Sequence, residues 1–141
     1  MTTPKAMNKK LILLLSLFGI AMAFISTYWI TSTTAELSVW FVILLACAYI
    51  ISTKCSQKYF LNGFVTGILC SLFVTAAHIW LFDDYANHHL ERVMQFGSMP
   101  MSPRTGMALM GPVFAVVSGL ALGLFSIIAS KIVKSPAPAA A

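Results

Sequence analysis

Charged side chains are scarce in this chain. Only 9% of its 141 residues are Asp, Glu, Lys or Arg, and 59% are hydrophobic, whereas a soluble domain is typically about a quarter charged. This scarcity excludes a water-soluble globule. Nine Lys and Arg residues against four Asp and Glu residues give a net charge of +5. So few cations, spread along the chain, do not make the dense basic face that nucleic-acid binding requires.

Motifs for catalysis and metal binding are missing too. The sequence has no glycine-rich phosphate loop, no H-E-x-x-H pair and no G-x-S-x-G turn. Its cysteines, Cys47, Cys55 and Cys70, lack the spacing of a zinc or redox site. All four acidic residues fall at one boundary of the apolar segments, so the mid-membrane acid of a proton-coupled exporter is not expected. These absences predict a protein that is not an enzyme and has no cofactor.

The chain does have long apolar segments. Four windows contain no charged residue: 11–35, 37–53, 59–82 and 105–130. A helix needs about 20 mainly apolar residues to cross the hydrocarbon core, and an isolated strand cannot satisfy its backbone there. We therefore predict an all-α, multi-pass protein of a bacterial inner membrane, with a four-span domain at 11–134. Its spans are predicted at about 11–31, 36–53, 59–82 and 105–130.

The positions of the cations predict the orientation. Seven of the nine lie before the first span, between the second and third, or after the fourth. Cytoplasmic loops are enriched in Lys and Arg, so we predict a four-helix up-down bundle with both termini cytoplasmic. Trp29, Trp40 and Trp80 near the outer span ends agree, since indoles favour the headgroup level. Segment 1–10 is then a basic cytoplasmic N-terminus, and the Pro/Ala-rich segment 135–141 a disordered tail.

The first span has an alternative interpretation. A basic leader, an apolar run and Ala21-Met22-Ala23 together fit a cleavable signal peptide. The run continues to Ile30, beyond the about 7–15 residues of a signal peptide's apolar region, which favours a retained helix. Cleavage would leave three spans with the same orientation.

Local signals predict where two helices begin and where one bends. Thr33 followed by Glu36 predicts a capping box at the second span. Ser102-Pro103 predicts an N-cap followed by proline at the first helical position of the last span. Pro112 removes one backbone donor inside that span and predicts a tolerated kink.

Small residues repeat every fourth position on the last two spans, which places each row on one helix face. Such rows let membrane helices approach closely. Because the two spans are predicted to be antiparallel, we expect four contacts between the rows. The expected pairs are Gly63 with Gly123, Gly67 with Gly119, Ser71 with Ala115, and Thr75 with Gly111.

Two polar residues lie inside the third span. His78 near its outer end is expected to be hydrogen-bonded between helices or to reach water, with a proton relay as the alternative. Asn62 at the inner end is expected to make a polar contact between helices. Both belong to the sparse polar path, with Ser71 and Thr75, that a small-solute carrier would use.

The outer loop 83–104 concentrates the remaining chemistry. Tyr85, His89, Val93 and Phe96 recur at helical spacing, which predicts one short amphipathic helix on the outer membrane surface. Thioether and imidazole ligands together suit Cu(I). The candidate metal ligands are His88, His89, Met94, Met99 and Met101.

Several of these residues form a pattern found elsewhere. Asn62-Gly63-Phe64 opens the third span, Tyr85 follows in an acidic outer loop, and a glycine-rich last span ends in Lys131-Ile132-Val133-Lys134. Over roughly residues 9–134 this resembles a bacterial four-span membrane-protein family defined only as a domain of unknown function. The resemblance implies a four-span fold and no activity.

Three functional hypotheses follow. The favoured one is a non-enzymatic accessory or assembly subunit that packs through small-residue faces, either as a homo-oligomer or with another membrane protein. The second is a small-solute carrier or channel. The third is metal binding, to copper in particular, by the outer loop.

Overall fold

The computed structural model describes residues 7–133. The predicted tail 135–141 and positions 1–6 of the predicted N-terminal segment lie outside the described residues. Within the described range the chain forms six helices and no strand. They are α1 (Lys9–Tyr28), α2 (Thr33–Lys54), α3 (Tyr59–Trp80), α4 (Phe82–His88), α5 (Leu90–Gly97) and α6 (Pro103–Ile132). The prediction of an all-α chain is confirmed over this range.

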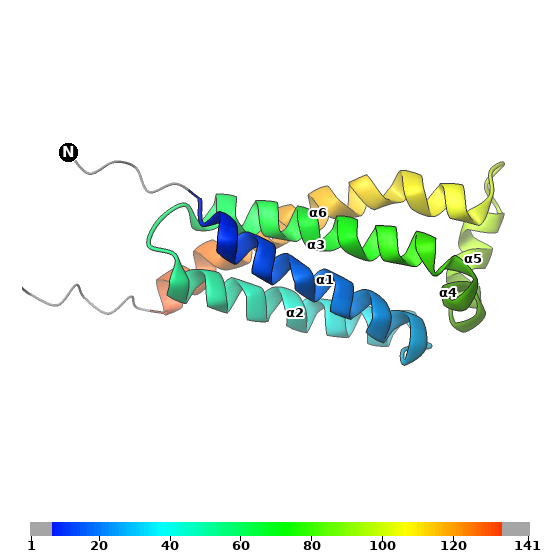
Figure 1. Ribbon diagram of the computed structural model, residues 1–141, viewed down its shortest axis with the longest axis horizontal. Helices are drawn as coiled ribbons and strands as arrows, with labels where there is room; N and C mark the ends of the chain where they lie inside the picture. Colours follow the sequence, from blue (N-terminus) through cyan, green and yellow to red (C-terminus); the bar gives the residue numbers. More distant parts are fainter. Residues whose placement is uncertain (1–6, 134–141) are drawn as a thin grey trace, which may run out of the picture.

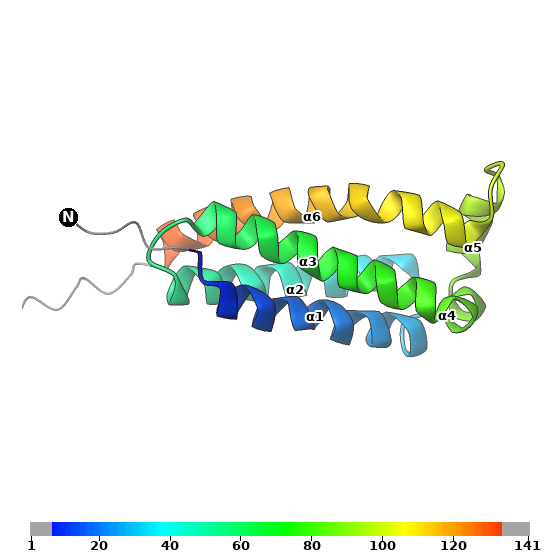
Figure 2. The same ribbon diagram turned by 45° about the horizontal axis from the view of Figure 1, so that its top comes forward.

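Four of the helices described here, α1, α2, α3 and α6, are long and apolar enough to cross a membrane. They lie alongside one another on the long axis of the molecule, and α4 and α5 gather at one end (Figures 1 and 2). We call this end the loop end. The opposite end, where α1 begins and α6 finishes, is the terminal end.

The helix starts follow from local capping. α2 begins at Thr33 because the Ser32 hydroxyl accepts a hydrogen bond from the amide of Ala35 at 3.1 Å. The predicted capping box of Thr33 and Glu36 is wrong, since the Glu36 side chain turns into the bundle. At α6 the prediction is confirmed: Ser102 is the N-cap, and Pro103 is the first helical residue. The helix continues unbroken through Pro112.

Glycines allow α3 to lie directly against α6. A Cβ added at Gly67 would sit 2.7 Å from the Gly119 Cα, and one added at Gly63 would sit 2.9 Å from the Gly123 Cα. Real Cβ atoms essentially never lie this close to another heavy atom, and here that atom is backbone that cannot easily move, so these positions require glycine. The same construction at Gly111 meets the Thr75 methyl at 2.5 Å.

The remaining predicted pair is buried, and α1 makes a second close approach to α3. Ser71 on α3 and Ala115 on α6 are both buried. On α1, a Cβ at Gly19 would collide with the backbone of Cys70 in α3. Helix α3 therefore has a close backbone neighbour on two of its sides.

The apolar core lies toward the terminal end. It joins α1, α2 and α6 through the buried side chains Leu15, Leu44, Cys47, Ala48, Ile51 and Leu122. Phe41 and Phe125 add an edge-to-face contact between α2 and α6, with ring centroids 5.8 Å apart. The terminal half of the bundle is thus closed by direct side-chain packing.

The outer loop contains two short helices in place of the predicted single amphipathic helix. The helical path breaks at His89, whose φ of −128° and ψ of 52° are not helical. Tyr85, in α4, is buried toward the bundle. Phe96, in α5, lies against the start of α6, where a Cβ at Gly106 would come within 2.8 Å of its ring. The predicted helical spacing is present in both short helices, but the break at His89 gives α4 and α5 different directions.

Candidate functional site

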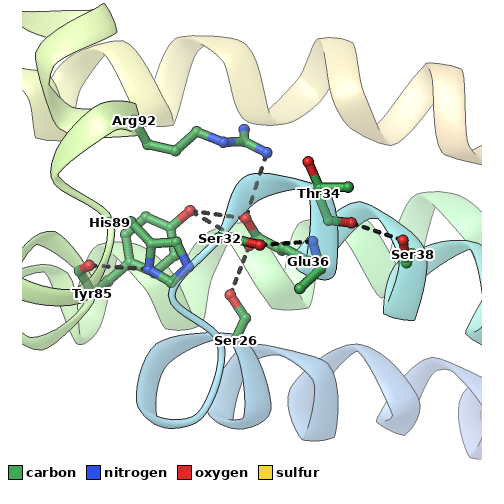
Figure 3. Close-up of polar contacts among 9 residues, drawn as sticks. Ser26, Ser32, Thr34, Glu36, Ser38, Tyr85, His89 and Arg92 are labelled. Carbon is green, nitrogen blue, oxygen red and sulfur yellow. Dashed lines mark hydrogen bonds and ion pairs between the residues drawn. The ribbon is translucent and has the colours of Figure 1, made fainter.

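A buried carboxylate organises the loop end. Glu36 in the first turn of α2 is only 7% exposed. The Ser26 hydroxyl of α1 donates to its Oε1 at 2.7 Å, and Arg92 Nη2 of α5 lies 3.5 Å from its Oε2. The Tyr85 hydroxyl of α4 donates to the same carboxylate at 3.4 Å. Figure 3 shows these three side chains converging on Glu36.

The position of Glu36 in its helix helps it to carry a charge. It lies one turn from the Ser32 N-cap, where the unpaired amides of a helix start favour a negative group. Its ion pair with Arg92 is itself largely buried, the two side chains being 10% and 21% exposed. The carboxylate therefore has a counter-charge and hydrogen bonds that offset its removal from water.

Tyr85 lies between two histidine rings. Its ring centroid is 4.1 Å from that of His78 in α3 and 4.2 Å from that of His89, and both pairs are stacked. Burial, followed by the charge of Glu36, raises the pKa of Tyr85 above its ordinary value of 10.0. The phenol, protonated at neutral pH like any tyrosine, serves as a donor to Glu36.

Next to this cluster is a cavity of about 130 Å³. It lies between α2, α3 and α6 in the loop half of the bundle, with α4 and α5 beside it. Its polar lining residues are Glu36, Ser71, Thr75, His78, Tyr85, Arg92 and Ser118. Apolar lining residues include Met22, Leu37, Trp40, Val74, Met107 and Phe114. A mainly apolar wall with a few convergent polar groups is typical of small-molecule sites.

Two polar atoms of the lining residues have no protein partner. His78 is 5% exposed, and its Nε2 makes no hydrogen bond within residues 7–133. The Nε of Arg92 is likewise buried without a partner in that range. Unsatisfied buried polar atoms cost roughly 1–3 kcal/mol each, and native proteins keep few of them. Both atoms belong to residues that line the cavity, but the atoms themselves are inaccessible and do not open onto it.

The structure divides the residues of the predicted polar path. Ser71, Thr75 and His78 all line the cavity. Asn62 does not: it accepts a hydrogen bond from the Asn8 amide at 3.1 Å and donates to the Lys58 carbonyl at 2.9 Å. The expectation that Asn62 makes a structural polar contact is thus confirmed, and the contact joins the start of α1 to the start of α3.

The structure separates the candidate metal ligands by exposure. His89 is 3% exposed, whereas His88 is exposed and its Nδ1 bonds the Asp84 carbonyl. The thioether residues Met94, Met99 and Met101 are exposed. Within the described part of the chain, no group of three or more His, Cys, Asp or Glu side chains lies close enough to hold a metal.

The cysteines are free thiols in the described range. Cys47 and Cys70 are buried inside the bundle, and Cys55 is half-buried just after α2. Burial raises the pKa of the Cys55 thiol, which lowers its thiolate fraction.

Three residues of the site, Glu36, Arg92 and Tyr85, are not recognisable as partners from the sequence. The charge pattern places Glu36 at a span boundary and Arg92 in the outer loop, and the helical spacing places Tyr85 on a surface helix. One signal was available: Glu36 alone separates two long apolar windows joined by a short turn. A charged side chain in such a short turn lies close to the bundle, which indicates burial. Its partner does not follow from the sequence, because Arg92 is 56 residues away in the chain.

Comparison with protein-family models, with curated proteins and with solved structures gives no match to this chain.

Proposed function

We propose that this chain is a multi-pass protein of a bacterial inner membrane, folded as an up-down bundle with both termini in the cytoplasm. Support comes from its four apolar helices and from the cations, seven of which fall on one side of the spans. In this orientation the loop end, with Glu36 and the cavity, faces the outside of the cell.

We further propose that the protein is a carrier that binds a small amphipathic solute in the cavity during transport. The observation that carries this proposal is the cavity itself, in which the polar side chains Ser71, Thr75 and His78 belong to a mainly apolar lining. An apolar cavity without such side chains would be consistent with simple packing imperfection.

Two competing roles have less support. An open channel requires a continuous path, but the terminal half of the bundle is packed with core side chains around Leu44 and Leu122. An assembly role through small-residue faces requires those faces to be free, but Gly63, Gly67 and Gly119 already contact neighbouring helices of the same chain.

The proposal is tested by filling the cavity. Val74 on α3 lines the cavity, whereas Val65, earlier on the same helix, does not. We expect small ring compounds, benzene or phenol, to raise the Tm of the full-length protein in detergent, and Val74→Phe to abolish the shift. Val65→Phe makes the same change in side chain outside the cavity and should keep the shift. If neither compound raises the Tm of the parent protein, or if Val74→Phe leaves the shift intact, the proposed function is wrong.

A further inference from the structure

We propose that the solute of this cavity is a small neutral alcohol, no bulkier than one ring, whose hydroxyl is bound by the side chains of Ser71, Thr75 and Ser118. This inference rests on the proposed function and specifies its ligand. It follows from three hydroxyls that have no partner within the described residues, from the size of the cavity and from its charge balance.

Elsewhere on the same two helices, buried hydroxyl side chains bond to their own backbone. On α3, the Thr66 hydroxyl donates to the Asn62 carbonyl at 2.7 Å. On α6, the Ser126 hydroxyl donates to the Leu122 carbonyl at 2.7 Å. A bond to the carbonyl four positions earlier is a common way for a helix to satisfy a Ser or Thr side chain. These hydroxyls therefore need no ligand.

The three hydroxyls that line the cavity lack such a bond. Ser71 and Thr75 lie one turn apart on α3, and Ser118 lies on α6, which packs directly against α3. Among residues 7–133, no side-chain hydrogen bond involves any of these three hydroxyls. The wall shared by α3 and α6 thus carries free donors and acceptors.

The hydroxyl oxygens of this wall open onto the cavity. Ser71 and Ser118 are only 5% and 7% exposed, so protein covers most of each side chain. Over the described range, the buried side-chain atoms that have neither a partner nor access to open space are all nitrogens. The oxygens of Ser71 and Ser118 therefore still reach open space, and the cavity is the space that both residues line. Because an unpaired buried hydroxyl costs free energy, the site favours a molecule that bonds to it.

A ligand hydroxyl is the best complement to a group of three hydroxyls. Each Ser or Thr hydroxyl donates one hydrogen bond and accepts others. An alcohol also donates and accepts, so it can receive a bond from one of these side chains while it donates to another. An ether or a ketone only accepts, and an apolar molecule satisfies none of the three.

The size of the cavity limits the rest of the solute. The cavity measures about 130 Å³, slightly less than the roughly 150 Å³ of an apolar cavity that holds benzene. Leu37 and Phe114 line it and remain 54% and 48% exposed, so it is open on one side. One ring with a single small substituent is therefore the upper limit, and multiply substituted rings are excluded.

The charge balance selects a neutral molecule. The one carboxylate of the lining, Glu36, is already paired with the one guanidinium, Arg92, at 3.5 Å. Ser26 and Tyr85 also donate to Glu36. A charged ligand would lose its hydration without meeting an unpaired opposite charge, which is unfavourable in a buried site.

The test compares phenol with fluorobenzene, in which a fluorine of similar size replaces the hydroxyl. The full-length protein in detergent is titrated with each compound at neutral pH, and the affinity is derived from the Tm shift. In a cavity without hydrogen-bonding groups phenol is the weaker ligand, because its hydroxyl loses its bonds to water. In the parent protein we expect phenol to bind at least as tightly as fluorobenzene.

Thr75→Val and Thr66→Val provide a matched pair of variants on α3. Thr75→Val removes a cavity hydroxyl and keeps the branched shape of the side chain. It should weaken the binding of phenol roughly tenfold and leave that of fluorobenzene unchanged. Ser71→Ala should act in the same direction. Thr66→Val removes a hydroxyl that bonds to the backbone and does not line the cavity, so both affinities should stay as in the parent protein.

The outcomes separate the two proposals. If Val74→Phe blocks fluorobenzene binding but phenol is the weaker ligand in the parent protein, the alcohol inference is overturned and the proposed function stands. Phenol binding that survives both Thr75→Val and Ser71→Ala contradicts the assignment of the hydroxyls. An equal loss of phenol binding in Thr66→Val contradicts it too, because the effect would then be structural. If benzene, fluorobenzene and phenol all fail to bind, the proposed function itself is overturned.

Discussion

Arg92 Nη2 lies 3.5 Å from Glu36 Oε2, although 56 residues separate them in the chain. Glu36 stands at the start of α2 and Arg92 in the short helix α5, so this ion pair fastens the outer loop to the bundle. Because both side chains are largely buried, the pair also leaves the adjacent cavity without excess charge. One contact therefore serves both the fold of the loop end and the chemistry of the site.

The first prediction concerns this pair. Arg92→Gln leaves the Glu36 carboxylate without its counter-charge and should lower the free energy of unfolding by about 1.5–3 kcal/mol, the range for hydrogen bonds to charged groups. Glu36→Gln combined with Arg92→Gln should recover part of that loss, since no uncompensated charge remains. Unfolding in mixed micelles, analysed as a double-mutant cycle, measures the coupling.

The exposed pair of Arg104 and Asp83, 3.9 Å apart with side chains 52% and 93% exposed, provides the control. Arg104→Gln should change the stability by less than about 1 kcal/mol. If Arg104→Gln costs as much as Arg92→Gln, the special role of the buried pair is refuted.

The second prediction concerns alkaline pH. The unfolded chain ionises Tyr85 near its ordinary pKa of 10.0, whereas burial and the charge of Glu36 raise the pKa in the folded protein. The folded state then holds a proton that the unfolded state has lost, so the contribution of Tyr85 to stability is complete below about pH 10 and declines as the pH rises further. Tyr85→Phe should flatten this part of the stability profile. Identical slopes for parent and variant above pH 10 would argue against a buried, protonated phenol.

The third prediction concerns the contact between α3 and α6. Gly67→Leu places side-chain atoms where the Gly119 backbone lies, 2.7 Å from the added Cβ, and should destabilise the bundle by at least about 1–3 kcal/mol, the usual cost of overpacking. Gly119→Leu should behave in the same way. Gly97→Leu is the matched control, because nothing lies within 4 Å of a Cβ at Gly97. Equal melting of all three variants would disprove the close packing of the two helices.

The fourth prediction tests the orientation in the membrane. Cys55 lies between α2 and α3 at the terminal end, and Ser98 is exposed at the loop end. A membrane-impermeant maleimide should label Cys55 only after the cytoplasmic side is opened, and more slowly than an exposed peptide thiol because burial raises its pKa. In a Cys55→Ser background, Ser98→Cys should be labelled from the outside in intact cells. The reverse pattern would invert the proposed topology and place the cavity on the cytoplasmic side.

The sequence by itself determined the class of the protein. The four charge-free windows predict four long membrane-spanning helices. In lipid a segment must satisfy its own backbone amides, and a helix does so through hydrogen bonds within the segment. The start of α6 at Ser102-Pro103 was equally readable, since capping depends on neighbours in the chain. These features are local and need no knowledge of the fold.

The tertiary structure alone decided the site. Glu36 and Arg92 are ordinary boundary charges in the sequence, and only the placement of α5 at the loop end, against α4 and α6, brings them within reach of each other. The break at His89 divides the apparent surface helix into α4 and α5, and Tyr85 in α4 is buried and stacks on His78 of α3. The reason is physical: the partner that lets a buried charge persist lies in another helix, and helical periodicity carries no information about contacts across 56 residues.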